Sequence, residues 1–216
     1  MNLDINTCKI LGCIGALLAF ISLFAELVEM YVLPNALFIL GVILITTSLY
    51  GLSKHYRDST IFRKALIGSA AGIIGLVVAG IIVFTLLLPS IVPLMQIVYP
   101  GWDGNWNALP NTIPGVSMID SNATLEALAP MWNNLLISLG IMSVFAIIAT
   151  YFMRQSLNRL GEKSNIGLFG ITGTVMLIGG FLTVCLIGYI LLCITPLLLA
   201  IAFLKIKPQA NTTQHT

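Results

Sequence analysis

The sequence predicts an all-α polytopic membrane protein with six transmembrane helices and both termini in the cytoplasm. Three observations predict this fold. Hydrophobic residues make up 58% of the 216 residues and charged residues only 8%, whereas a soluble domain carries about 25% charge. The apolar runs are continuous rather than alternating, which favours helices because helices satisfy their own backbone groups in lipid. Finally, all ten lysines and arginines fall on one side of the predicted topology.

The same composition excludes several classes of protein. Too few polar residues are present to cover a water-facing surface, which excludes a soluble globular enzyme and a disordered chain. No basic stripe exists outside short membrane-flanking loops, so a nucleic-acid partner is excluded. The four cysteines lie in apolar stretches without metal-type spacing, and we expect no cofactor.

The first two spans follow from length and a proline. A bilayer core of about 30 Å needs about 20 apolar residues as a helix. Residues 10–31 meet this requirement and form span one. Pro34 is well placed in the first turn of span two, which runs to about residue 52. The charged segment 54–64 then predicts a loop.

Spans three and four flank a long segment of different composition. Residues 65–88 form span three, which Pro89 and Pro93 end or kink. Residues 131–153 form span four, and the charged residues 154–163 predict a second loop.

Spans five and six share one apolar run. As a single helix, residues 166–206 would reach about 61 Å, twice the thickness of the core, so this run must cross twice. Gly188 is the best position for the turn between the two crossings. We therefore expect one membrane domain over 1–207 and a polar cytoplasmic tail over 208–216.

Charge sets the orientation. The six-span topology places every basic residue on the side of the two termini: Lys9, Lys54, Arg57, Arg63, Lys64, Arg154, Arg159, Lys163, Lys205 and Lys207. The opposite side carries only acids: Glu26, Glu29, Asp103, Asp120 and Glu126. Positive residues accumulate on the cytoplasmic side, so both termini are predicted to be cytoplasmic.

The outer segment 89–130 holds the clearest candidate for ligand contact. Trp102, Asp103, Asn105 and Trp106 form a compact polar-aromatic motif within it. The alternating acid and amides resemble the start of a calcium loop, but the later ligand positions do not fit, so we predict no metal site. Two roles stay open: the tryptophans stack on an outer ligand, or they rest at the membrane surface, which indole rings prefer.

Glu26 and Glu29 form a second candidate site near the outer end of span one. They lie three residues apart and so share one helix face. A carboxylate inside a bilayer is by default a functional hypothesis, here a cation or proton site. The alternative is a pair of interfacial acids, because both lie in the last turns of the span.

Glycines at helical spacing predict close helix packing, in the bundle or at a homodimer face. The residues that carry this prediction are Gly68, Gly72, Gly75, Gly170 and Gly173. The two charged loops also resemble one another, since each leads into a glycine-rich helix. A weak two-fold repeat of helical hairpins and convergence of ordinary loop chemistry both stay open.

Three stretches together resemble the archaeal multi-pass membrane family known as domain of unknown function 996. They cover residues 8–24, 49–68 and 177–207, and the middle one, LYGLSKHYRDSTIFRKALIG, is the most specific. The resemblance implies a plasma-membrane protein and carries over no functional residues.

No catalytic constellation is present, so we expect no enzymatic activity. The expected role is a non-catalytic membrane component, in contact with the lipid bilayer, that packs with itself or with a membrane protein partner. Two alternatives are a channel or transporter for a small neutral solute, and an outer-surface ligand sensor. Spans two to six contain no Asp, Glu, Lys, Arg or His between their predicted ends, which argues against a carrier of charged solutes.

Overall fold

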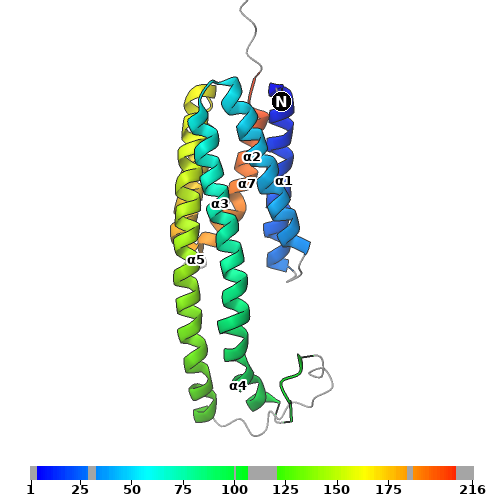
Figure 1. Ribbon diagram of the computed structural model, residues 1–216, viewed down its shortest axis with the longest axis vertical. Coiled ribbons are helices and arrows are strands. Elements are labelled where there is room, and N and C mark those ends of the chain that lie inside the picture. The colour runs from blue at the N-terminus through cyan, green and yellow to red at the C-terminus, as the bar shows by residue number, and fades with distance from the viewer. Residues whose placement is uncertain (1–3, 29–32, 100, 107–120, 184–186, 208–216) are drawn as a thin grey trace, which may run out of the picture. The chain divides into compact units, whose positions relative to one another are not determined.

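The computed structural model describes residues 4–28, 33–99, 101–106, 121–183 and 187–207 (Figure 1). The elements are α1 (Ile5–Val28), α2 (Leu33–His55), α3 (Ser59–Ile82), the π-helix η1 (Val83–Leu87), α4 (Leu88–Val98), α5 (Ser121–Ser164), α6 (Gly167–Leu182) and α7 (Ile187–Leu204). The chain divides into two compact units. Unit 1 contains Met1–Ile73 and Phe145–Thr216, and unit 2 contains Ile74–Val144.

Every regular element in the described part of the chain is a helix, which confirms the all-helical prediction. Five helical segments are long and apolar enough to cross a bilayer: Ile5–Ala25, Ala36–His55, Ser59–Val98, Leu128–Ser164 and Ile187–Leu204. The sixth apolar helix, α6, has 16 residues and reaches about 24 Å.

Both charged loops predicted from the sequence are wrong in extent. Helix α2 continues to His55 and α3 begins at Ser59, so the predicted loop 54–64 shrinks to a three-residue turn. Helix α5 continues to Ser164, and the predicted loop 154–163 is therefore helical. Charged side chains do not end a helix by themselves; a change of backbone conformation does.

That change occurs at one residue in each turn. Arg57 and Asn165 adopt the left-handed conformation, with φ of 52° and 58°. The next residue in each turn donates its N–H back into the preceding helix, Asp58 to Ser53 O at 3.0 Å and Ile166 to Gly161 O at 3.1 Å. This is the Schellman pattern, which satisfies carbonyls that the helix end leaves free.

The two hairpins α2–α3 and α5–α6 repeat more than their turns. Aligning the two sequences at the left-handed residues pairs Ser48 with Ser156, Leu49 with Leu157, Leu52 with Leu160 and Ile61 with Phe169, and all eight side chains are fully buried. Each serine also hydrogen-bonds a carbonyl of another helix: Ser48 Oγ donates to Cys8 O at 2.6 Å, and Ser156 Oγ donates to Ile61 O at 2.7 Å. The similar loops therefore belong to a structural repeat.

The hydrophobic core lies in unit 1. Helices α1 and α2 pack closely because two glycines face each other: a Cβ added at Gly15 would lie 2.7 Å from Gly41 O. Helices α6 and α7 meet through the rings of Phe169 and Phe203, whose centroids are 5.4 Å apart. Gly12 of α1 lies against the Phe203 ring, which joins α1 to α7.

Unit 2 corrects the predicted end of span three. Pro89 and Pro93 do not end the helix, since helical structure continues to Val98. A proline ring clashes with the carbonyl four residues earlier, and the chain forms the π-helix η1 immediately before Pro89, where the Leu88 N–H bonds to Val83 O.

Two further boundaries differ from prediction. Helix α5 begins at Ser121 with Pro130 inside it, so part of the predicted irregular segment 89–130 is helical. Gly188 does not form the turn between spans five and six, because α7 already begins at Ile187. Gly188 instead packs against the end of α6, where a Cβ would collide with Gly179 O and with the backbone of Leu182 and Thr183. The tail 208–216 lies outside the described residues.

Candidate functional site

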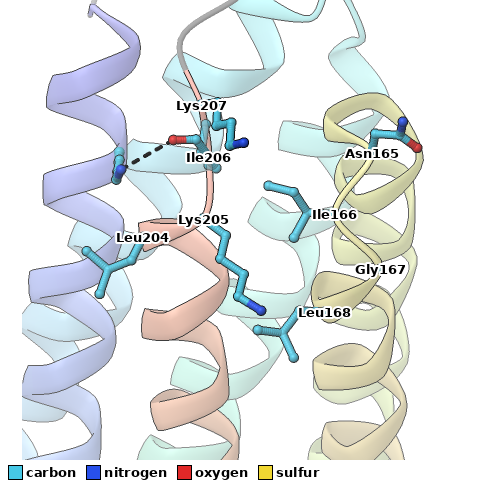
Figure 2. A pocket seen from close by; sticks show the side chains of 9 residues that line it. Asn165, Ile166, Gly167, Leu168, Leu204, Lys205, Ile206 and Lys207 are labelled. Atoms are coloured by element: carbon cyan, nitrogen blue, oxygen red, sulfur yellow. Dashed lines mark hydrogen bonds between the residues drawn. The ribbon is translucent and has the colours of Figure 1, made fainter.

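A basic pocket opens in unit 1 where the end of α7 lies beside the start of α6 (Figure 2). Its volume is about 550 Å³. Three lysines line it, together with backbone and apolar groups: Lys9, Lys205, Lys207, Asn165, Ile166, Gly167, Leu168, Leu204 and Ile206. We refer to these nine residues as the basic pocket.

The end of α7 places two of the lysines. After Leu204 the chain makes a last turn, in which Ile206 N–H donates to Phe203 O at 3.1 Å. The Ile206 side chain is buried in the core, so its neighbours Lys205 and Lys207 stay exposed. Figure 2 shows both lysine side chains extending toward the start of α6.

The third lysine comes from α1. Lys9 Nζ donates a hydrogen bond to Ile206 O at 3.3 Å, drawn as the dashed line in Figure 2. This bond links residues near opposite ends of the chain, and it leaves the other two Nζ protons of the ammonium group available for another acceptor.

The opposite wall of the basic pocket is the first turn of α6. Ile166 is the N-cap residue and is extended, with φ −116° and ψ 96°, and no side chain caps this helix. The first N–H groups of a helix have no partner within the helix, and they carry a partial positive charge. The first turn of α6 contains no acidic residue either.

The electrostatic balance of the basic pocket is one-sided. None of its nine residues is acidic, and in the described ranges no carboxylate pairs with its three lysines. The ion pair Arg159–Glu162, at 3.3 Å, lies outside the basic pocket and is largely exposed. Three lysines and a helix N-terminus without a side-chain cap thus line one open pocket, an arrangement that favours an anion.

Comparison with known proteins identifies the family. The profile of a family described as a protein of unknown function, DUF996, matches residues 37–197. The chain belongs to this family. It is also 22% identical to the uncharacterized protein MJ1644 of Methanocaldococcus jannaschii over 206 residues, which cover 95% of each chain. No solved structure matches.

Membership of DUF996 confirms the resemblance inferred from the three sequence stretches. The match spans most of the chain, from α2 into α7, so it covers most of both hairpins rather than one motif. The archaeal relative aligns over nearly its full length and has a comparable size. Neither the description of the family nor the name of the relative states an activity.

In unit 2 of this DUF996 protein, the predicted tryptophan motif forms a compact turn. The rings of Trp102 and Trp106 meet edge to face at 4.8 Å. Trp102 is only 4% exposed, and its Nε1 donates to Asn105 O at 2.6 Å. Asp103 Oδ1 accepts the Asn105 N–H at 2.9 Å. The Trp102 indole N–H is thus used within the turn, while Trp106 remains 43% exposed.

The candidate acidic pair falls mostly outside the described structure. Glu26 lies within α1, but its side chain is not among the described ones, and Glu29 lies outside the described residues. A cation or proton site there stays a prediction. No group of three or more potential metal ligands occurs in the described part of the chain.

The predicted packing glycines differ in how closely they approach their neighbours. A Cβ at Gly68 would lie 2.9 Å from Ala149 O, and one at Gly173 would lie 3.1 Å from Arg154 Cα. Gly72 and Gly170 have only ordinary contacts, with nearest atoms at 3.8 Å and 3.5 Å. Gly75 lies in α3. Gly68 and Gly173 therefore sit where two helix backbones come close together.

Arg154 is a residue that the sequence reasoning missed. It lies in α5, about 15 Å of helix before Ser164, rather than in a loop. Its Nε is buried, with no hydrogen-bond partner among the described residues. The sequence placed Arg154 in the loop 154–163, so its helical position corrects that loop and not the expectation for span four, whose predicted ends are 131 and 153. The missing helix-breaking signal between Met153 and Arg159 could have revealed the continuous helix.

Proposed function

We propose that this DUF996 protein is a six-span, non-catalytic component of the plasma membrane, with both termini in the cytoplasm. One observation carries the proposal: all ten lysines and arginines lie in the first two turns of α1 and α3, at the end of α2 or in the turn after it, in the last third of α5, or just after α7. A strong imbalance of basic residues between the two ends of a helical membrane protein marks its cytoplasmic side.

Contacts within unit 1 support a common cytoplasmic end. The bond from Lys9 to Ile206 O brings the start of α1 and the end of α7 together. The bond from Ser48 to Cys8 O ties α2 to the start of α1, and the bond from Ser156 to Ile61 O ties α5 to the start of α3. The start of α1, the end of α7 and both hairpin turns thus lie at one end of unit 1, as expected for an even number of crossings.

A role in helix packing is supported by the small residues at the helix crossings. Glycines let backbones approach closely, and in lipid such packing replaces the hydrophobic effect as the force between helices. Gly15 and Gly41 use this approach inside unit 1. Meanwhile many large apolar side chains face outward, among them Phe84, which is 72% exposed, and they are available to lipid or to another membrane protein.

The topology is tested with single introduced cysteines and a membrane-impermeant maleimide. Asp103→Cys and Asp120→Cys should label in intact cells. Arg57→Cys, Arg159→Cys and Gln209→Cys should label only after the membrane is permeabilised. The unmodified chain, whose cysteines lie in apolar stretches, supplies the background. Labelling of Arg159→Cys from outside would overturn the proposed topology.

A further inference from the structure

We propose that the basic pocket binds the phosphate of an anionic phospholipid headgroup at the cytoplasmic membrane surface. The proposal deepens the proposed function, because it rests on the cytoplasmic position of this end of unit 1. The shared chemistry is that of a phosphate group, which also occurs in soluble anions. The observations concern one cavity, its three lysines and its apolar wall.

Two of the lysines can donate hydrogen bonds to the same anion. Lys205 and Lys207 line the cavity from the end of α7, and Lys9 lines it from α1. No acidic residue lines the cavity, so the mutual repulsion of the ammonium groups is not relieved within it. A phosphate oxygen that accepts hydrogen bonds from two lysines would neutralise this repulsion and form charge-assisted bonds.

The two hairpins differ at the residue just before their second helix, where only the first hairpin has a carboxylate. At the start of α3, the Asp58 carboxylate accepts the Thr60 N–H at 3.0 Å and so caps the helix within the chain. The equivalent residue at the start of α6 is Ile166, which has no acceptor. The uncapped end of α6 opens into the cavity that the lysines line. The cavity and its lysines carry the proposal, and the helix end adds to the same field.

The apolar part of the cavity favours a lipid over a free anion. Ile166, Leu168 and Leu204 line the cavity beside the lysines, and their side chains are partly or largely exposed. A soluble phosphate would leave these side chains in contact with water, whereas the glycerol and first acyl carbons of a phospholipid would cover them. Basic pockets between transmembrane helices on the cytoplasmic side bind anionic headgroups for this reason.

The test measures lipid affinity of the purified full-length chain in an uncharged detergent. Apparent Kd values for phosphatidylglycerol, with phosphatidylcholine as reference, are obtained by native mass spectrometry. The double variant Lys205→Gln/Lys207→Gln should weaken phosphatidylglycerol binding by about thirtyfold, because each lysine near an anionic headgroup contributes about a factor of five. Lys205→Arg/Lys207→Arg should bind within about twofold of the unmodified chain, which shows that the loss does not come from misfolding.

A matched control distinguishes the loss of charge in the basic pocket from the loss of the same charge elsewhere on the surface. Lys54→Gln/Lys163→Gln removes two exposed charges from the same end of unit 1 outside the pocket, and it should change the Kd by less than about twofold. Equal losses in the two glutamine variants would overturn the proposal. Full displacement of the lipid by excess inorganic phosphate would overturn the lipid as the ligand.

This assay is independent of orientation. It uses solubilised protein, so a failure to bind phosphatidylglycerol would leave the proposed topology intact. Conversely, external labelling of Arg159→Cys would overturn the topology without changing the measured Kd. Preferential binding of phosphatidylglycerol that depends on Lys205 and Lys207 supports the site.

Discussion

The hairpins α2–α3 and α5–α6 share a buried frame but differ in their polar groups. Both have a left-handed turn residue, a buried serine that bonds to another helix, and two buried leucines. In the first hairpin, Thr46 and Ser69 form a hydroxyl pair at 2.8 Å, and Asp58 caps α3. In the second, the position of Thr46 holds Arg154, whose Nε lacks an acceptor in the described structure, and α6 is uncapped.

The residues that the two hairpins share stabilise them, whereas the polar residues in which they differ determine whether a hairpin can bind a ligand. The shared residues are apolar or internally hydrogen-bonded, so they stabilise both hairpins in the same way. The first hairpin satisfies its own polar groups, whereas the second leaves a buried arginine nitrogen without a partner in the described structure and a helix N-terminus without a side-chain cap. The second hairpin also borders the basic pocket. Binding is therefore expected at the second hairpin and not at the first.

The largest expected effect comes from filling the glycine contacts of both hairpins. Gly68→Leu and Gly173→Leu should each destabilise the protein by about 3 kcal/mol, because a side chain would collide with the backbone of α5. SDS titration in mixed micelles measures the change. Gly80→Leu is the control, since nothing lies within 4 Å of that position. Unchanged stability of both variants would show that α3 and α6 do not approach α5 closely at these glycines.

Truncating equivalent leucines tests whether the buried residues shared by the two hairpins contribute equally to the stability of the protein. Leu52→Ala and Leu160→Ala should each cost about 2 kcal/mol, because both side chains are fully buried and each truncation leaves a cavity. Leu66→Ala, at a side chain that is 48% exposed, should cost little in the same titration. A difference of more than about 1 kcal/mol between Leu52→Ala and Leu160→Ala would show that the two leucines do not contribute equally to stability.

Removing the cap of the first hairpin should have a smaller effect. Asp58→Ala should cost about 1 kcal/mol, because the Thr60 N–H loses its acceptor. Asp58→Asn, which keeps an acceptor at this position, should retain most of the stability in the same SDS titration. If Asp58→Ala left the stability unchanged, the cap on α3 would not stabilise the protein, and the two hairpins would not differ in stability for this reason.

The smallest expected effect distinguishes Thr46 from Arg154. Thr46→Val should cost about 0.6 kcal/mol, the typical contribution of a hydrogen bond between membrane helices. Arg154→Met should cost nothing or stabilise the protein, because its buried Nε has no acceptor to lose. Thermal unfolding in detergent, compared between the two variants, checks the sign. A large loss for Arg154→Met would mean that Arg154 is paired within the folded protein.

The sequence by itself determined the membrane class and the helical content, because both depend on properties summed along the chain. It also revealed the family through three stretches of local sequence. It failed at the helix ends: charge suggested loops at 54–64 and 154–163, but the backbone turns at Arg57 and Asn165. A left-handed residue at a helix end is selected by hydrogen bonds to the preceding turn, and charge does not report them.

Only the tertiary structure decided where the functional groups meet. The basic pocket joins Lys9 to residues 165–168 and 204–207, which lie far apart along the chain. The tertiary structure likewise placed Arg154 beside Gly173 and buried the equivalent residues of the two hairpins. Such groupings depend on which helix faces pack together, and in lipid those faces are chosen by close packing of small residues rather than by hydrophobicity, which is nearly uniform along these helices.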